Sequence, residues 1–572
     1  MSRVQGQVNE YRWRTYVLFL LTAAAFSSLV WRAIDLQVLR QDFLQDQGDA
    51  RHLRVVAIPA HRGMILDRNG DPLAVSTPVD SVWANPREMS LDRESIEPLA
   101  AVLGLDGDEL QHFLLSRKGR EFVYLKRQMK PEMADRVRQL HIPGISLQRE
   151  YHRYYPGGEV FAHVLGFTDI DDHGQEGLEL AFDEWLTGEP GLKRVVQDGR
   201  RHVVRDVDGI RVAHPGKDLI LSIDRRIQYL AYRELKAAVD KHKALSGSAV
   251  VLDANTGEVL AMVNQPSFNP NNRRNFRPQA MRNRSVTDVF EPGSTVKPFI
   301  VASALESGNY DANTPIDTTP GIYQLGVKTI RDVRNFGLLN VTSILTKSSN
   351  VGISKIALSL EADDIWSVLQ RIGFGNVTAS SFPGEVAGIL PDPQRWGDLG
   401  KATLSYGYGL SVTPLQLAHA YSVLASKGAL RPISLLRVDE PVAAQQVLTT
   451  QIAQKIVRML ETVVGPGGTA KRARIAGYRV AGKTGTMKKS IAGGYADHRY
   501  LSVFAGMVPA SDPRLVMAVM INEPSVGGYY GGKVAAPVFA NTLSGALRLL
   551  NINPDDLSIM QSQHAVGNGG AV

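Results

Sequence analysis

The sequence of 572 residues contains no cysteine and no long run of basic residues. The absence of cysteine excludes disulfides and cysteine-ligated zinc, and it suits a protein exported to an oxidising compartment. The net charge is +7, but the lysines and arginines are scattered, so we expect no nucleic-acid partner. The histidines lack metal-site spacings such as His-Glu-x-x-His, and we expect neither a metal nor a cofactor.

Long hydrophobic stretches are also scarce. Apolar residues make up 44% of the chain and charged residues 21%, which is close to the averages of soluble globular proteins. This composition argues against a protein with several membrane spans and against wholesale disorder. The length predicts two or three folded units.

One long uncharged run lies near the N-terminus, over residues 15–31 between Arg14 and Arg32. As a helix this run would reach roughly 25 Å, a little less than the bilayer core of about 30 Å. Apolar residues continue as far as Phe43, so the run can be extended. We therefore expect a transmembrane anchor over 15–34 and a juxtamembrane helix or linker over 35–54.

The charges beside this run predict its orientation. Arg3, Arg12 and Arg14 precede it, so the positive-inside rule keeps residues 1–14 in the cytoplasm and sends the folded part across the membrane. A cleaved signal peptide is the alternative, because Ala23–Ala25 are small residues of the kind found at cleavage sites. The apolar run continues past these alanines, which favours a retained anchor.

Behind the anchor, the sequence predicts two modules of mixed α+β class. Residues 55–217 mix short β-branched runs with turn residues, as in an α+β pedestal, and from residue 218 a strand-like run at 219–224 leads into a helical pattern. Two hairpins and a helix are expected further on, at 248–253 with 258–263, at 501–508 with 515–522, and at 537–550. Residues 218–551 should therefore form an antiparallel sheet covered by helices, followed by a disordered tail over 552–572.

Three short motifs occur in order, and the first is Ser294-Thr295-Val296-Lys297. The preceding turn, 291–293, would deliver Ser294 to a helix N-terminus, where positions i and i+3 share one face. A lysine whose pKa is lowered by burial can take the proton of a neighbouring serine. The helix N-terminus also supplies N–H groups for a developing oxyanion. The pattern is weak alone, since it arises by chance about once or twice in a chain of this length.

The second motif is Ser348-Ser349-Asn350, which precedes an apolar stretch over 351–360. Its alternative interpretation is a helix N-cap without a catalytic role. Residues 307–309 have the same Ser-x-Asn pattern. They lie at the far end of the helix that begins at Ser294, where glycine and asparagine are typical of a C-terminal cap, so we reject them as a site.

The third motif is Lys483-Thr484-Gly485-Thr486, at the end of a strand-like run over 478–481. Glycine at a strand edge lets a substrate backbone approach, lysine adds a positive field, and Thr486 can donate a hydrogen bond to a carboxylate. An ordinary edge strand that carries a lysine is the alternative interpretation.

Together the three motifs are typical of penicillin-binding proteins and serine β-lactamases. The chain resembles the class B penicillin-binding proteins over roughly residues 55–550. Further segments that carry this resemblance are 61–70 (HRGMILDRNG), 153–159 (RYYPGGE) and 174–179 (GQEGLE). Two others, 78–86 and 160–168, resemble the division-type members of this class.

The resemblance implies a transpeptidase fold and a role for each motif residue. Ser294 would attack the penultimate D-Ala carbonyl of a peptidoglycan stem peptide, with Lys297 as general base. The other implied roles are proton transfer to the leaving amine by Ser348 and Lys483, contact with the acyl chain's amide by Asn350, and carboxylate binding by Thr486 beside Thr484 and Gly485. The backbone amides of Ser294 and Thr486 would form the oxyanion hole.

The resemblance also implies partners and a location. A neighbouring stem peptide would accept the acyl group through an amine, and β-lactams, which mimic D-Ala-D-Ala, would stall the enzyme at the acyl stage. The chain would lie in a bacterial inner membrane as a single-pass protein with a periplasmic catalytic domain. A polytopic glycan polymerase (FtsW-like) and other divisome membrane proteins would be its partners.

Some residues allow a structural as well as a functional interpretation. Tyr500, Tyr529 and Tyr530 could wall the substrate cleft, as aromatic residues do near this family's active site, or could simply pack. We interpret the cluster of Arg153, Tyr154 and Tyr155 and the carboxylates of segment 61–70 as bracing the domain junction.

Three other functions are compatible with the same motifs. A D,D-carboxypeptidase or a β-lactamase would hydrolyse the acyl-enzyme. A β-lactamase needs a second base, and Glu385 lies in the relevant interval, although its surroundings (PGEVAG) do not resemble that enzyme's loop. The third alternative is an accessory divisome scaffold or β-lactam sensor with little catalytic turnover.

Overall fold

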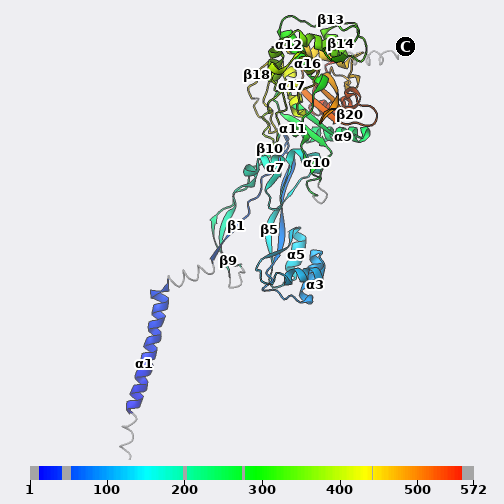
Figure 1. The fold of residues 1–572 in the computed structure, drawn as a ribbon. Helices are drawn as coiled ribbons and strands as arrows, with labels where there is room; N and C mark the ends of the chain where they lie inside the picture. The colour runs from blue at the N-terminus through cyan, green and yellow to red at the C-terminus, as the bar shows by residue number, and fades with distance from the viewer. Residues whose placement is uncertain (1–11, 42–52, 198–202, 273–276, 441, 557–572) are drawn as a thin grey trace, which may run out of the picture. The chain divides into compact units, whose positions relative to one another are not determined.

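The computed structural model describes residues 12–41, 53–197, 203–272, 277–440 and 442–556 (Figure 1). The chain divides into two compact units. The small unit contains residues up to 61, 80–150 and 188–215, and the large unit contains 62–79, 151–187 and the chain from 216 onward. A single boundary at 217 therefore does not describe this division. Two segments of the expected pedestal, 62–79 and 151–187, belong to the large unit.

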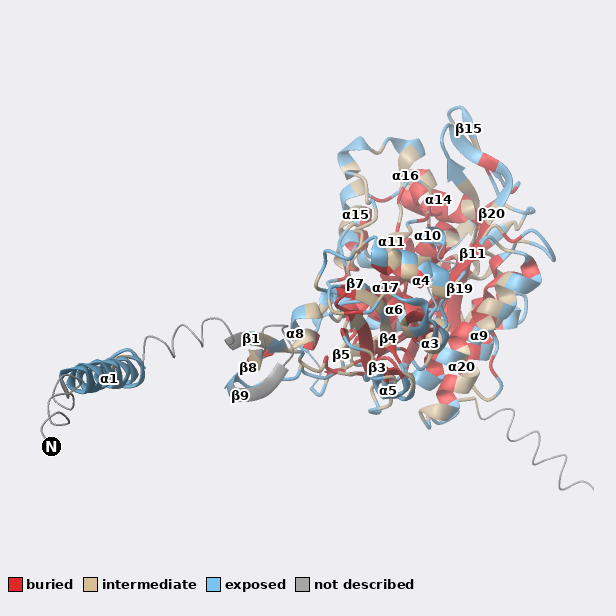
Figure 2. Cartoon of the chain, turned by 90° about the horizontal axis from the view of Figure 1, so that it is seen from below, coloured by how far each residue is buried: buried red, intermediate tan, exposed pale blue. Residues whose placement is uncertain are grey.

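The N-terminal helix α1 (Arg12–Ile34) continues into a π-helical turn, η1 (Asp35–Leu39). Its apolar segment, Trp13–Leu39, has a mean hydropathy of 1.8 and is long enough to cross a bilayer. Residues 13–34 are exposed, and the helix is drawn pale blue in Figure 2. A helix with this much exposed apolar surface suits a single-pass membrane anchor. Residues 1–11 and 42–52, parts of the expected tail and linker, lie outside the described residues.

The small unit contains a three-stranded antiparallel sheet and a group of helices. The sheet has the order β1-β8-β9, formed by β1 (Leu53–Ile58), β8 (Gly191–Gln197) and β9 (Val203–Arg211). The helices are α3 (Arg93–Leu103), α4 (Gly107–Leu115) and α5 (Pro131–Gln139), beside strand β4 (Val123–Met129). Asp92 and Asp106 cap α3 and α4 by accepting backbone hydrogen bonds, which explains where these helices begin.

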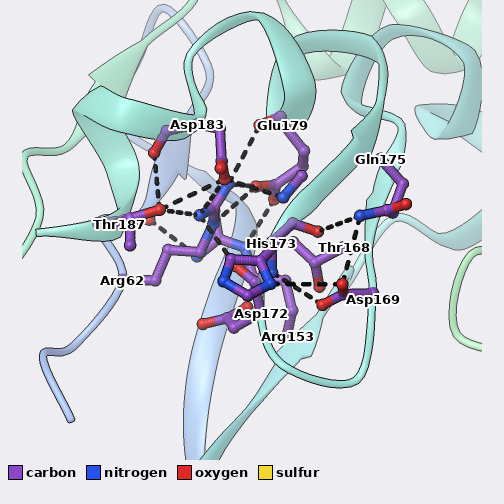
Figure 3. Close-up of polar contacts among 12 residues, drawn as sticks. Arg62, Arg153, Thr168, Asp169, Asp172, His173, Gln175, Glu179, Asp183 and Thr187 are labelled. Atoms are coloured by element: carbon purple, nitrogen blue, oxygen red, sulfur yellow. Dashed lines mark hydrogen bonds and ion pairs between the residues drawn. The ribbon is translucent and has the colours of Figure 1, made fainter.

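A buried ion cluster lies in the large unit near α7 (Gly177–Ala181) and α8 (Asp183–Thr187) (Figure 3). The Glu179 carboxylate pairs with Arg62 at 2.8 Å and with Arg153 at 2.7 Å. Arg62 also pairs with Asp183 at 2.7 Å. Arg62, Arg153 and Glu179 are all buried, so these segments are joined by charges that water does not screen. Arg153 therefore pairs with Glu179 in a structural ion cluster and does not belong to the motif residues described below.

Removing one member of this cluster should cost more stability than removing an exposed ion pair. We predict that Glu179→Gln lowers the free energy of unfolding of the large unit by about 3–5 kcal/mol, because it removes the carboxylate that pairs with the buried Arg153 and one of the two carboxylates that pair with the buried Arg62. Glu159→Gln is the matched control, since the Glu159–Lys236 pair is about half exposed and should contribute about 1 kcal/mol or less. Denaturant unfolding of the purified variants measures both; equal losses would contradict the prediction.

The centre of the large unit is a five-stranded antiparallel sheet with the order β12-β11-β21-β20-β19. Its strands are β11 (Ser246–Asp253), β12 (Val259–Gln265), β19 (Ala481–Ile491), β20 (Gly494–Val508) and β21 (Leu515–Asn522). Two hairpins, β11–β12 and β20–β21, occupy the segments that the sequence predicts. β19 lies at an edge of the sheet, so one side of this strand has no neighbouring strand.

Helices cover both faces of this sheet. Every residue of β11 is buried, and successive side chains of a strand point to opposite faces. Helices α9 (Arg225–His242) and α20 (Ala536–Leu549) pack against the sheet, as does α17 (Pro414–Ala425), all of whose residues are buried. The expected fold class, an antiparallel sheet covered by helices, is confirmed.

The remaining elements are β2 (Ile65–Leu66), β3 (Pro72–Ala84), β5 (Ile145–Tyr154), η2 (Gly158–Val160), α6 (Ala162–Leu165), β6 (Phe167–Thr168), β7 (Gly174–Glu176), β10 (Leu219–Ile220), α10 (Pro278–Met281), α11 (Arg284–Thr287), β13 (Pro315–Asp317), β14 (Ile322–Leu325), β15 (Lys328–Arg331), β16 (Leu338–Asn340), α15 (Ala362–Arg371), η4 (Pro393–Arg395), α16 (Asp398–Leu404), β17 (Ala429–Leu430), β18 (Gln445–Gln446), α18 (Thr450–Val464), η5 (Lys471–Ala473) and α19 (Gly531–Val534). They include a second sheet with the order β10-β2-β3-β4, in which β5 pairs with β3. Four further helices carry the first two motifs and are described with them.

The C-terminal boundary lies later than the sequence predicts. Residues 552–556, expected to belong to the disordered tail, are held against the large unit. The Asp555 carboxylate accepts hydrogen bonds from the Arg479 backbone N–H at 2.7 Å and from the Ser511 hydroxyl at 2.7 Å. The polar residues of this segment thus have partners that its sequence alone does not reveal, and residues 557–572 lie outside the described residues.

Candidate active site

Ser294 lies on a single 3-10 turn, η3 (Gly293–Val296), which leads directly into α12 (Lys297–Glu306). Gly293 has φ of 55°, and a Cβ at this position would lie 2.6 Å from Met487 Cε. Glycine is therefore required for the sharp turn before Ser294. The sequence predicts this turn and helix, and the structure adds the 3-10 geometry at their junction.

The second motif connects two helices, α13 (Val341–Lys347) and α14 (Asn350–Leu358). Ser348 has φ of 60°, a left-handed conformation that costs a residue with a side chain about 1–2 kcal/mol. Ser349 is the N-cap of α14 and accepts a hydrogen bond from the Gly352 N–H at 2.9 Å. The N-cap interpretation thus applies to Ser349, whereas the hydroxyl of Ser348 is directed to the lysines of the other two motifs.

Lys297 is fully buried and contacts the second motif. Its Nζ donates to the carbonyl oxygens of Ser348 and Ser349, at 2.8 and 3.1 Å, and to Asn350 Oδ1 at 2.8 Å. Nζ also lies 3.3 Å from Ser348 Oγ. Among the described residues, none forms a hydrogen bond with the Ser294 hydroxyl, so the contact expected between Lys297 and Ser294 is not made in this state of the site.

Lys483 is fully buried on β19, and its Nζ donates to Ser348 Oγ at 2.8 Å. The third motif lies inside β19, which begins at Ala481. The sequence predicts instead a strand over 478–481 that ends before the motif. The expected position of this strand is therefore wrong by several residues. Small residues such as Gly482 and Gly485 obscure its pattern, because they are usually depleted in strands.

The rest of the third motif packs against the serine turn and a neighbouring helix. A Cβ on Gly485 would lie 3.0 Å from the Pro292 carbonyl oxygen, so this glycine lets β19 approach the serine turn rather than a substrate. Thr484 shares a hydrogen bond of 2.9 Å with Thr469. The Thr486 hydroxyl accepts from the Gly531 N–H at 3.0 Å, which leaves its own proton available for an acceptor in the cleft.

The three motifs meet at a cleft of about 600 Å³. Six of the residues selected from the sequence line it: Ser294, Ser348, Asn350, Thr484, Thr486 and Tyr530. Lys297 and Lys483 are buried beside it and reach the lining through Ser348. The rejected segment 307–309 follows the end of α12 and does not line this cleft.

Burial strongly affects both lysines. Burial lowers the pKa of Lys297 well below its ordinary value, the nearby Lys483 lowers it further, and the Asp332 carboxylate partly opposes this shift. Burial lowers the pKa of Lys483 to about 7. Neutral amines at near-neutral pH can accept protons from serine hydroxyls, as general-base catalysis requires.

Comparison with known families gives two matches along the chain. Residues 247–544 match the penicillin-binding protein transpeptidase domain. Residues 57–221 match the penicillin-binding protein dimerisation domain.

The chain belongs to the penicillin-binding protein family.

Individual members of this family are similar to it over almost their whole length. The peptidoglycan D,D-transpeptidase FtsI of Escherichia coli is 45% identical over 100% of this chain and 97% of its own. The probable peptidoglycan D,D-transpeptidase PbpC of Pseudomonas aeruginosa is 44% identical over 97% of this chain and 98% of its own. The solved transpeptidase domain of Burkholderia pseudomallei penicillin-binding protein 3 is 42% identical, with a TM-score of 0.55, covering 59% of this chain and 97% of that one. The resemblance to this family is confirmed.

The three aromatic residues selected in this penicillin-binding protein do not all reach the cleft. Tyr500 and Tyr529 stack with ring centroids 3.9 Å apart, and the ring of Tyr530 lies 4.7 Å from that of Tyr529, tilted by 31°. Of the three, Tyr530 lines the cleft. Both interpretations therefore apply in part. Tyr500 and Tyr529 pack against each other, and Tyr529 supports Tyr530 at the wall of the cleft.

Sequence reasoning missed Asp332, which lies just after β15. Its carboxylate accepts from the Ser349 hydroxyl at 2.5 Å and from the Asn350 and Val351 N–H groups at 2.5 and 3.1 Å. An anion at a helix N-terminus is favoured by the unpaired N–H groups there. Asp332 thereby fixes the second motif, but no motif or spacing in the sequence marks it.

The lowered pKa of Lys483 predicts a pH dependence of acylation. Below about pH 7 Lys483 holds a proton that can pass through Ser348 to the departing amine, and above it this proton is lost, whereas burial keeps the pKa of Lys297 low on both sides of pH 7. We expect the second-order rate of acylation by a fluorescent penicillin to fall as the pH rises from about 7 to 9. Lys488→Gln, which removes a half-exposed lysine on the same strand, should keep this profile; a rate that still rises at pH 9 would contradict it.

Proposed function

We propose that this protein is a peptidoglycan D,D-transpeptidase that cross-links stem peptides at the division septum. The observation that carries the proposal is the position of Ser294 at a cleft beside two buried lysines that share the Ser348 hydroxyl. The names of the relatives, among them FtsI, support the same reaction and its place in division.

The acylation step uses Ser294 as nucleophile. Its Oγ attacks the carbonyl carbon of the penultimate D-Ala, and the neutral amine of Lys297 takes the Oγ proton. The new oxygen–carbon bond replaces the peptide C–N bond, and the departing D-Ala amine receives a proton through Ser348 and Lys483. The short contact from Lys483 Nζ to Ser348 Oγ supports this route.

Substrate contacts surround the nucleophile. Asn350 is oriented by Lys297 at Oδ1 and by the Arg331 carbonyl at Nδ2, 3.2 Å away, and it borders the cleft where the acyl chain would lie. The Thr486 hydroxyl proton is free for the terminal carboxylate. The backbone amides of Ser294 and Thr486 stabilise the oxyanion, as hydrogen-bond donors fixed before the reaction do. The edge position of β19 supports this role, since an edge strand has backbone groups without a strand partner.

The second step transfers the acyl group to an amine of a neighbouring stem peptide. The amine nitrogen bonds to the acyl carbon, the ester bond to Ser294 Oγ breaks, and the proton of the amine returns to this oxygen through Lys297. Hydrolysis would need a base for water. Glu385, the sequence candidate, accepts hydrogen bonds from both N–H and hydroxyl of Thr378 and of Ser380, so its oxygens hold its own loop together. This favours transfer over β-lactamase activity.

Topology and partners follow from the anchor. Arg3, Arg12 and Arg14 precede the uncharged run 15–31, so the N-terminus is cytoplasmic and the large unit periplasmic in a bacterial inner membrane. Glycan strands must be polymerised next to the site of cross-linking. The anchor and the dimerisation domain are therefore the parts through which a polytopic glycan polymerase (FtsW-like) and other divisome proteins would bind.

Ser294→Ala tests the reaction directly. Membranes that contain the wild-type chain should give a persistent covalent band of about 63 kDa with a fluorescent penicillin, and the variant should give none, because the nucleophile is absent. Ser307→Ala, in the rejected Ser-x-Asn segment, is the matched control and should be labelled like the wild type. Absence of labelling in folded wild-type protein would refute the enzyme and favour a non-catalytic scaffold, and steady hydrolysis of a chromogenic cephalosporin would favour a β-lactamase.

A further inference from the structure

The cleft at Ser294 has more positive than negative side chains. Lys347, Lys471, Arg472 and Lys533 line it, and among the described lining residues Asp332 is the one carboxylate. Both oxygens of Asp332 are already occupied by the N-terminus of α14 and the Ser349 hydroxyl. This carboxylate therefore does not neutralise the lining lysines and arginine.

Three of these cations are available to a ligand. Lys471, Arg472 and Lys533, which we call the basic rim, are exposed, and none forms an ion pair with a carboxylate in the described part of the chain. Lys347 differs, because its Nζ donates to the Gly467 carbonyl at 2.9 Å. The basic rim is thus the part of the cleft whose charged groups are exposed and have no carboxylate partner among the described residues.

The backbone of the basic rim is fixed relative to the third motif. Lys471 and Arg472 lie on η5, between Ala470 and Ala473, both of which are fully buried. Lys533 lies on α19, whose first residue, Gly531, donates its N–H to the Thr486 hydroxyl. The rim is thus attached to the same elements that would position the substrate's terminal carboxylate.

We propose that the basic rim binds side-chain carboxylates of the stem peptide, in addition to the terminal carboxylate. The protein then prefers stem peptides whose side-chain carboxylates are free over peptides in which they are amidated. Cations in a cleft concentrate an anionic ligand, and an arginine can hold a carboxylate with two parallel hydrogen bonds. This inference rests on the proposed function, because it concerns the substrate of the same site.

Binding to a chain that cannot react tests the rim separately from catalysis. Full-length Ser294→Ala in detergent is titrated with two fluorescent pentapeptides that end in D-Ala-D-Ala, one with free side-chain carboxylates and one with carboxamides. A single exposed ion pair contributes little, but two or three such pairs can form together at the rim. We therefore expect the free form to bind about fivefold to thirtyfold more tightly. Raising NaCl from about 0.05 to 0.5 M should shrink this ratio, because salt screens exposed charges.

Substitutions in the same background identify the residues responsible. The combined change Lys471→Gln, Arg472→Gln and Lys533→Gln should bring the ratio close to one. Lys455→Gln with Arg458→Gln is the matched control: both residues are exposed on α18, outside the cleft, and should leave the ratio unchanged. Equal binding of the two peptides, or a ratio that survives the triple substitution, would overturn the proposal.

Labelling by a fluorescent penicillin separates this proposal from the proposed function. The triple variant with Ser294 intact should still be acylated, which shows that it is folded and that its nucleophile works. If the wild-type chain were not acylated, the proposed function would fail, while the binding ratio in Ser294→Ala would still decide whether the rim recognises carboxylates.

Discussion

Two buried lysine amines that share one serine hydroxyl are the constraint on which the site depends. Water is excluded from Lys297 and Lys483, so a positive charge on either is costly, and two charges together are costlier still. The pair therefore holds fewer protons than two exposed lysines would at neutral pH. The Ser348 hydroxyl contacts both amines, and the strained left-handed backbone of this residue makes the arrangement possible.

The surrounding structure keeps these three residues together. The sheet presents β19 at its edge, Gly485 lets that strand approach the serine turn, and Asp332 fixes the start of α14. Each of these elements is needed because the lysines come from segments 186 residues apart in the sequence. The site is thus a product of sheet order and helix capping as much as of the motif residues.

The basic rim adds a different kind of interaction to the same cleft. The buried lysines act through desolvation, which shifts their proton affinity, whereas the exposed rim cations attract anions through solvent. One cleft can therefore use lysine as a base at its floor and as a cation at its edge. Burial is the physical difference between the two roles.

The sequence by itself determined the anchor, the two modules, the hairpins and the residues of all three motifs. These features are local: each depends on hydrophobic periodicity, turn residues or short spacings. The structure decided what depends on distant segments. It extended the large unit with segments 62–79 and 151–187, placed the third motif inside β19 and gave Lys297 its partners in the second motif. It also gave Asp332 a role that no local pattern carries, because hydrogen bonds between segments far apart in the chain form only once the fold has brought them together.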